Sequence, residues 1–194
     1  MSLPCLDAMN CLGIVENRGI PNGCMYIVYL ERGDIRHAAG TMLAESWSLE
    51  DVSALDACEG FVLSYFFEHV EQACRICLRV VLPHEEPSVD SIAAIYQGAD
   101  WHERETADFF GISFVGHPNP VRLLLPSDMD IFPLRKAEAA RAPVATLFPC
   151  PAEALVFRKP GFTLLDVPSG DKPEASQTTP ATASAPAAAE AETA

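Results

Sequence analysis

The stretch FVLSYFFEHVEQACRICLRVVLP, residues 61–83, decides the fold of this chain. Its two halves, Phe61–Val70 and Cys74–Pro83, are rich in aromatic and β-branched residues, which favour strands. In the second half Ile76, Leu78 and Val80 alternate with residues that face the other way, as expected of a strand with one buried face. Because only a short polar link separates the halves, we expect an antiparallel hairpin.

Strand and helix patterns continue on both sides of this hairpin. Alternating or continuous apolar runs predict further strands at Met25–Leu30 and Leu49–Ala57. Apolar residues at helical spacing, preceded by a capping residue, predict helices at Ile35–Ser46, Ser88–Tyr96 and Trp101–Phe110, with Asp34, Ser88 and Asp100 as the caps. These elements predict an α+β fold, a two-layer sandwich in which helices cover one face of a mainly antiparallel sheet.

Composition divides the chain into four parts. Residues 1–24 contain scattered Gly and Pro with little periodicity, and we expect a loosely ordered lead-in. Residues 25–126 form the α+β domain, and residues 127–167 are a Pro-rich, extended segment suited to wrapping over a partner. Residues 168–194 are rich in Ala, Pro, Ser, Thr and Glu, and such a segment buries too little apolar surface to offset its ordering entropy, which predicts a disordered tail.

The overall charge excludes several classes of function. The 194 residues carry a formal net charge of −14, which repels phosphate backbones and anionic lipid head groups. No run approaches the roughly 18 to 20 apolar residues that span a bilayer, and the first residues lack the basic and apolar regions of a secretory signal. We therefore expect neither nucleic-acid binding nor direct membrane insertion, and contact with a membrane only through partners.

Cysteines and histidines do not form a recognisable site. The cysteines are odd in number and irregular in spacing, which argues against a disulfide framework; they are Cys5, Cys11, Cys24, Cys58, Cys74, Cys77 and Cys150. Only Cys74 and Cys77 form a CxxC pair, and on a strand positions three apart point to opposite faces. No histidine array typical of zinc sites and no Gly-rich nucleotide motif is present, so we expect no metal and no cofactor in this chain.

The densest polar cluster is DWHERETADFF, residues 100–110. Glu103 and Glu105 contain the carboxyl groups of a possible acid–base pair, but positions two apart on a helix diverge by about 200°. Arg104 lies one turn from both Asp100 and Asp108, which predicts a ladder of ion pairs on one helix face. We therefore interpret this helix as structural, and a free-standing enzyme that uses Glu103, Arg104 and Glu105 is the alternative.

The basic residues Arg122, Arg135 and Lys136 form the one basic patch of an acidic chain. They suit either an anion or the carboxylates of a protein interface, for which the arginine fork is well shaped. Nearby apolar anchors favour the interface.

The order of these motifs resembles the C subunit of NADH-quinone oxidoreductase, the 30 kDa subunit family of respiratory complex I. The resemblance covers about Ser46 to Lys136 and rests on WHERETADFFGISFVGHP (Trp101–Pro118), RLLLP (Arg122–Pro126) and PLRK (Pro133–Lys136). The signature and interface positions that it predicts are Trp101, Glu103, Arg104, Glu105, Asp108, Phe110, Gly111, Gly116, His117, Pro118, Arg122, Pro126, Pro133, Leu134, Arg135 and Lys136. Ala107 departs from the pattern, because the family usually has an aromatic residue there.

The resemblance implies a non-catalytic subunit in the peripheral arm of a complex that couples NADH oxidation to quinone reduction and ion translocation. The expected partners are a large, D-like quinone-site subunit and a small, B-like cluster-bearing subunit. FMN, iron–sulfur clusters and quinone are expected in partner subunits, and the location is peripheral, on the cytoplasmic side of the cell inner membrane. The alternative is the equivalent scaffold subunit of a membrane-bound group 4 [NiFe] hydrogenase or a formate hydrogenlyase-type complex, which the genes beside this one would distinguish.

Overall fold

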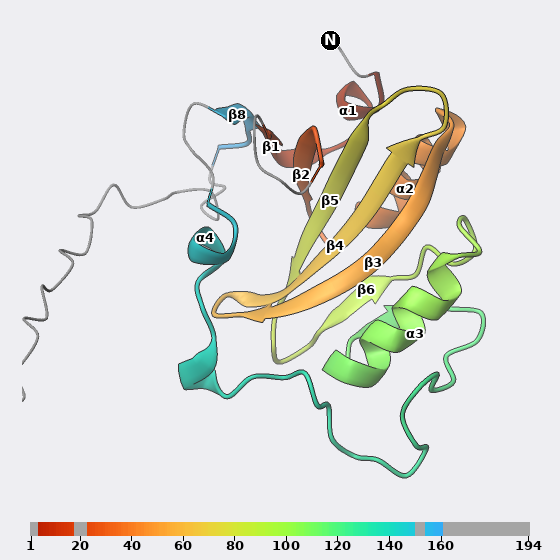
Figure 1. The fold of residues 1–194 in the computed structure, drawn as a ribbon, viewed down its shortest axis with the longest axis vertical. Coiled ribbons are helices and arrows are strands. Elements are labelled where there is room, and N and C mark those ends of the chain that lie inside the picture. The colour runs from red at the N-terminus through yellow and green to blue at the C-terminus, as the bar shows by residue number, and fades with distance from the viewer. Residues whose placement is uncertain (1–3, 18–22, 150–153, 161–194) are drawn as a thin grey trace, which may run out of the picture.

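A six-stranded mixed sheet forms the centre of the protein (Figure 1). The computed structural model describes residues 4–17, 23–149 and 154–160. The strand order across the sheet is β3-β4-β5-β2-β1-β8. The strands are β1 (Cys11–Glu16), β2 (Tyr26–Leu30), β3 (Trp47–Ala57), β4 (Gly60–His69), β5 (Arg75–Leu82) and β8 (Leu155–Arg158).

The hairpin predicted from residues 61–83 is confirmed as β4 and β5, which pair antiparallel. The register places Leu63 opposite Val80 and Tyr65 opposite Leu78, so the alternating apolar residues of both strands share one face. Strand β3 extends the pair on one side, also antiparallel. On the other side β2 pairs with β5 in the parallel direction, and β1 returns antiparallel to β2. The sheet is therefore mainly antiparallel, as expected.

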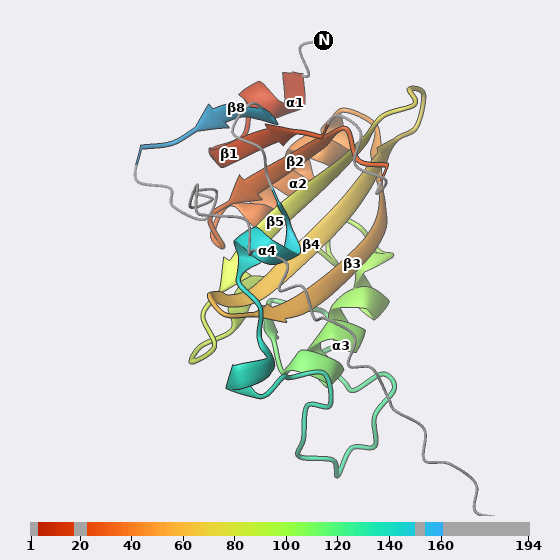
Figure 2. The ribbon, with the colours of Figure 1, turned by 60° about the vertical axis from the view of Figure 1, so that its left-hand side comes forward.

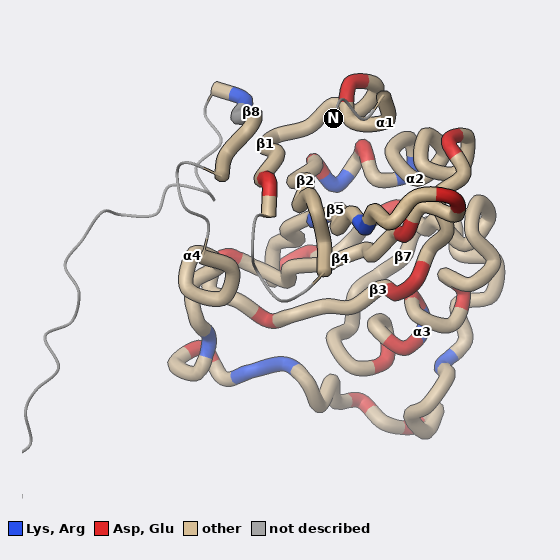
Figure 3. Tube along the Cα trace, turned by 45° about the horizontal axis from the view of Figure 1, so that its top comes forward, with Lys and Arg blue, Asp and Glu red and all other residues tan. Residues whose placement is uncertain are grey.

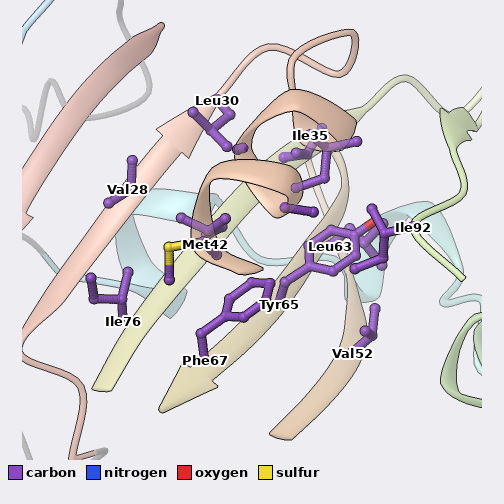
Figure 4. Close-up of a cluster of buried hydrophobic side chains, with 14 of the residues drawn as sticks. Val28, Leu30, Ile35, Met42, Val52, Leu63, Tyr65, Phe67, Ile76 and Ile92 are labelled. Carbon is purple, nitrogen blue, oxygen red and sulfur yellow. The ribbon is translucent and has the colours of Figure 1, made fainter. Parts of the chain in front are cut away.

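The main core lies between the sheet and two helices, α2 (Ile35–Ala44) and α3 (Ala99–Phe110). Figure 4 shows Met42 of α2 above Ile76, Tyr65 and Phe67 of the sheet. Helix α3 joins the same core through Phe110, whose ring meets that of Phe61 edge-on with centroids 6.0 Å apart. The mixed α+β class is confirmed.

The opposite face of the sheet carries smaller apolar clusters. Helix α4 (Val144–Leu147) lies over it, on the far side from α2 (Figure 2). Val144 packs with Ala57 and Val62, and the Phe148 ring lies 3.6 Å from the guanidinium carbon of the buried Arg79. The stretch that leads to α4 includes a short 3-10 helix, η1 (Glu138–Ala140).

Two expectations for the N-terminal half are wrong. The stretch 1–24, expected as a loose lead-in, holds helix α1 (Pro4–Asp7) and strand β1. Gly13 interrupts the apolar pattern of β1, yet Ile14 and Val15 are buried against neighbouring strands on either side. The sequence pattern alone shows neither of those neighbours.

The helix expected at Ser88–Tyr96 is also absent. Ser88–Asp90 is strand β6, which pairs in parallel with β7 (Ser113–Val115), and a turn closed by Ile95 N–H to Ile92 O (2.8 Å) follows it. The partner strand lies beyond α3 in the sequence, so a pairing over this distance overrides the local helical spacing.

The segment after α3 contacts its own domain. Ala142 forms an isolated bridge with Ala57, and its carbonyl accepts the Cys58 N–H at 3.1 Å. Part of the stretch 127–167, expected to wrap a partner, therefore wraps the sheet, and β8 adds a strand to it. The predicted tail, residues 168–194, lies outside the described residues. Within the described chain no helix has the length and apolar character needed to cross a bilayer.

Candidate functional site

Helix α3 and the loop after β7 bring most of the predicted signature residues together. The helix ends after Phe110, as the sequence predicts, and Gly111 follows in the left-handed conformation (φ 67°) and donates its N–H to Ala107 O at 2.8 Å. At the other end Asp100 lies inside the first turn and Gly98 is the N-cap, so Asp100 is not the cap that the sequence suggested.

Two α3 side chains one turn apart hold the loop segment 121–125 by its backbone. Arg104 donates from Nε to Val121 O at 2.7 Å and from Nη2 to Arg122 O at 3.2 Å. The Asp108 Oδ2 atom accepts the backbone N–H groups of the next three residues, Leu123, Leu124 and Leu125, at 2.9, 2.8 and 3.1 Å. We call this arrangement the backbone clamp. Its hydrogen bonds go to the main chain of the loop, and Arg122 is the loop side chain whose charge also acts on Asp108.

The clamp corrects the predicted ladder of ion pairs. Arg104 does reach Asp100, at 3.5 Å between Nη1 and Oδ2, but among the described residues it forms no ion pair with Asp108. Burial alone would raise the pKa of Asp108, whereas its three backbone donors and the nearby Arg122 together hold the pKa below its ordinary value. Asp108 is therefore an ionised, nearly buried acceptor.

Glu103 is fully buried and connects three elements. Its carboxylate accepts the Ser91 hydroxyl at 2.6 Å and the Ile92 N–H at 2.8 Å, and His117 Nε2 lies 3.7 Å from it. Burial raises the pKa of Glu103, and these donors oppose the rise. Glu105 is exposed on another side of the helix, so the two carboxyl groups share no site, as expected.

His117 sits between Glu103 and Asp100, with only 2% of its side chain exposed. Its Nδ1 accepts the Asn119 N–H at 3.0 Å, so the ring proton is on Nε2, which lies 3.3 Å from the Asp100 carbonyl oxygen and 3.4 Å from Asp100 Oδ1. This pairing fixes the turn after β7, and it places Gly116 (φ 76°) and the exposed Pro118 on the surface.

The PLRK motif folds back onto the end of α3. Arg135 donates from Nε to Phe110 O at 2.6 Å, and its guanidinium stacks over Phe132, 4.5 Å from the ring centroid. A Cβ at Gly111 would lie 2.6 Å from Arg135 Nη2 and 2.7 Å from Phe132 Cζ, so glycine is required there for space as well as for φ. The guanidinium of Arg135, expected to face a partner, is thus used within the domain.

Asp56 is a second anchor for this segment. Its buried carboxylate meets His84 Nε2 at 2.8 Å and Arg141 Nε at 3.0 Å, and it accepts the Lys136 N–H at 2.8 Å. Burial tends to raise the pKa of Asp56, but these partners lower it overall. Its partners lie far away in the sequence, and the local pattern shows only a polar residue in a strand.

Large apolar side chains on α3 and in the stretch 121–134 remain exposed. They are 49% to 67% exposed and comprise Trp101, Val121, Leu124, Ile131 and Leu134. We call them the exposed apolar set. Signature residues Pro126 and Pro133 lie exposed in the same loop, which runs beside α3 (Figure 1).

A cavity of about 250 Å³ lies between α3, β7 and the loop after β7. Ala107, Ile112 and Phe114 supply apolar wall, and Arg122 is among its polar residues.

The described residues contain no group of three or more His, Cys, Asp and Glu arranged to hold a metal ion. The CxxC thiols are buried, and burial raises the pKa of Cys74 and brings that of Cys77 to about 12. A thiol binds metal as the thiolate, so this pair is poorly suited as a ligand set. Acidic residues are spread along the described trace and basic ones are fewer (Figure 3), with acidic segments on both α3 and β3.

Comparison with known proteins identifies the family. Residues 28–144 match the family described as respiratory-chain NADH dehydrogenase, 30 Kd subunit. The J subunit of NAD(P)H-quinone oxidoreductase of Synechococcus sp. (strain WH7803) is 52% identical over 67 residues, which are 34% of this chain and 37% of that protein. The C subunit of NADH-quinone oxidoreductase of Roseiflexus sp. (strain RS-1) is 45% identical over 76 residues, 39% of this chain and 44% of that protein. The matches thus span less than half of these relatives.

A solved structure shares the fold. It is the membrane-bound sulfane sulfur reductase, described as an archaeal respiratory membrane complex, with a TM-score of 0.56 and 21% identity over 67% of this chain and 78% of that one. The family match spans more than half of this chain and includes α3, the backbone clamp and the PLRK motif. The chain belongs to the 30 kDa subunit family of respiratory-chain NADH dehydrogenase.

Proposed function

We propose that this chain is a non-catalytic scaffold subunit in the peripheral arm of an NADH-quinone oxidoreductase. The backbone clamp is the observation that carries the proposal. Arg104 and Asp108 hold a loop by its main chain, while Val121 and Leu124 of that loop remain exposed. A surface that is held rigid and presents apolar side chains is suited to protein association.

The charged residues of the signature support a structural role. Arg104, Asp108 and Arg135 bind backbone groups, and Glu103 is bound by Ser91 and Ile92. A catalytic group needs access to a substrate, whereas Glu103 is fully buried. The relatives are named as subunits of NADH- or NAD(P)H-quinone oxidoreductases, which supports the same assignment.

Within this proposal the exposed apolar set contacts a large, D-like quinone-site subunit and a small, B-like cluster-bearing subunit. FMN, the iron–sulfur clusters and quinone belong to partner subunits, and this chain binds none of them. The chain is peripheral on the cytoplasmic side of the inner membrane and is held there by its partners.

An equivalent scaffold in a group 4 [NiFe] hydrogenase or formate hydrogenlyase-type complex is the second candidate. A chain of a sulfane sulfur reductase complex shares this fold, so the fold also occurs outside quinone reductases. This observation favours retaining the second candidate. Identifying the partners distinguishes the two candidates. Flavin- and NADH-binding subunits support the first, and a large subunit with nickel-ligating cysteines supports the second.

The test is to isolate the tagged chain with its complex from native membranes and to identify the subunits by mass spectrometry. We expect NADH:quinone activity in the complex and none in the isolated chain. A chain that purifies without partner subunits, or that turns over substrate alone, would overturn the scaffold assignment.

Substitution of Arg104 separates scaffolding from chemistry. Arg104→Ala removes the donors to Val121 O and Arg122 O, so the loop loosens and less complex should assemble. Activity per assembled complex should stay at the wild-type value, and the exposed Arg32→Ala is the matched control. Full assembly of Arg104→Ala with lost turnover would contradict the scaffold role.

A further inference from the structure

We propose that the cavity beside α3 receives an aromatic side chain from a partner subunit, one that carries a hydrogen-bond acceptor, as tyrosine does. This inference rests on the proposed function and adds a defined point of contact to it. The cavity lies between α3, β7 and the clamped loop, so its shape depends on the same contacts that fix the loop.

The volume suits a ring. A cavity of roughly 150 Å³ lined by apolar side chains accommodates benzene, and this one measures about 250 Å³. Ala107, Ile112 and Phe114 provide apolar contact, and Ala107 contributes only a methyl group, which leaves the space open. Aromatic anchors in pockets of this kind commonly dominate the affinity of protein interfaces.

Arg122 is the reason why the occupant is expected to carry a hydrogen-bond acceptor. Its Nη1 atom is buried and has no hydrogen-bond partner among the described residues. A buried donor left unpaired is unfavourable by about 1 to 3 kcal/mol, so an acceptor on the occupant that the Arg122 side chain turns to meet would recover this energy. Glu103 and Asp108 also line the cavity and offset the charges of Arg104 and Arg122, so the lining has no excess of positive charge that would favour a carboxylate. A neutral acceptor such as a phenol oxygen fits better.

The cavity is continuous with the exposed apolar set. Val121 belongs to both: it lines the cavity and is 61% exposed. Its neighbour Pro120 also lines the cavity and is exposed. A partner that covers the exposed apolar set therefore passes directly over the mouth of the cavity.

The test fills the cavity from within. Ala107→Phe places a ring of this chain where the partner's ring is expected, and Ala44→Phe, on the exposed side of α2, is the matched control. The purified chains are titrated onto the complex prepared from cells that lack this subunit. We expect binding weakened roughly 30-fold or more by Ala107→Phe and unchanged by the control. The unfolding temperature of the isolated variant should equal or exceed that of the wild type.

A second variant and a crosslink keep the proposal testable if Ala107→Phe misfolds. Arg122→Met keeps the apolar stem and removes the donors, and roughly tenfold weaker binding is expected. Benzoylphenylalanine at Val121 should crosslink to the partner segment that carries the aromatic residue, located by mass spectrometry.

The outcomes separate this proposal from the proposed function. Wild-type binding together with equal binding of Ala107→Phe would overturn the occupied cavity and leave the scaffold role standing. Crosslinks confined to this chain's own residues would also overturn it, because its own residues would then fill the space. A wild-type chain that does not bind the complex would overturn the scaffold role itself, and the cavity proposal with it.

Discussion

Replacing Asp108 tests the backbone clamp most directly. Asp108→Ala leaves the N–H groups of Leu123, Leu124 and Leu125 without their acceptor. Hydrogen bonds to a charged group contribute about 1.5 to 3 kcal/mol each. The three bonds share one oxygen and the loop can move out into water, so their contributions are less than additive. We expect the free energy of unfolding to fall by about 3 kcal/mol in total. For a chain of this size that lowers the unfolding temperature by about 6 to 12 °C.

Asp108→Asn separates the effect of the charge from that of the hydrogen bonds, because it keeps an acceptor and removes the charge. Charge-assisted bonds are about twice as strong as neutral ones, so this variant should lose about 1.5 kcal/mol. The free energy of unfolding is measured by urea denaturation, and hydrogen exchange reports on the Leu123–Leu125 amides. The exposed Asp128→Ala is the control and should change stability by less than about 0.5 kcal/mol.

The pH dependence provides a second measurement of the same carboxylate. The folded-state pKa of Asp108 lies below its ordinary value of 3.8, so its stabilising contribution is present above that value. The contribution is lost as the pH falls through the folded-state pKa, and Asp108→Asn should remove this part of the acid sensitivity. Wild-type unfolding energy and wild-type exchange at Leu123–Leu125 in Asp108→Ala would refute the clamp.

Three further predictions concern the rest of the chain. Gly111→Ala should destabilise the domain by about 1 to 3 kcal/mol in urea denaturation, because φ is 67° and the added Cβ meets Arg135. Gly98→Ala, which meets nothing within 4 Å, should be neutral, and equal effects would contradict the steric reasoning. Asp56→Asn should lower the free energy of unfolding by about 3 kcal/mol and speed proteolysis after Arg141, because it removes the buried charge that this arginine meets. An unchanged rate of cleavage would show that Asp56 does not anchor this segment. Deleting residues 168–194 should leave complex abundance on native gels unchanged, and a large loss would show that the tail binds a partner.

Much of the sheet could be predicted because its signal is local. The alternation of residues 61–83 determines which face of β4 and β5 joins the main core, and the hairpin follows from the short link. Strand β6 could not be predicted, since its partner β7 lies beyond α3 and the spacing of Ile92 and Tyr96 imitates a helix. Strand β1 could not be predicted either. Gly13 interrupts its apolar pattern, and its pairing with β2 and β8 becomes evident only in the folded sheet.

The functional site also contains features that the local sequence predicts and features that it does not. Helix α3, its end at Gly111 and the separation of Glu103 from Glu105 follow from helical geometry. The partners of Arg104 and Asp108 do not, because helical spacing suggests that they pair with each other, whereas both bind backbone groups of residues 121–125. Main-chain atoms leave no pattern in the sequence, so contacts to them cannot be predicted before the fold is known.

Main-chain recognition has an evolutionary consequence. Because the hydrogen bonds of Arg104 and Asp108 to the loop go to its carbonyl and N–H groups, substitutions at Val121, Leu123 or Leu124 leave the clamp intact. The outward side chains of the loop are then free to vary, while the loop keeps its path. The surface that the loop presents can thus change by drift at these few positions, without redesigning the domain that carries them.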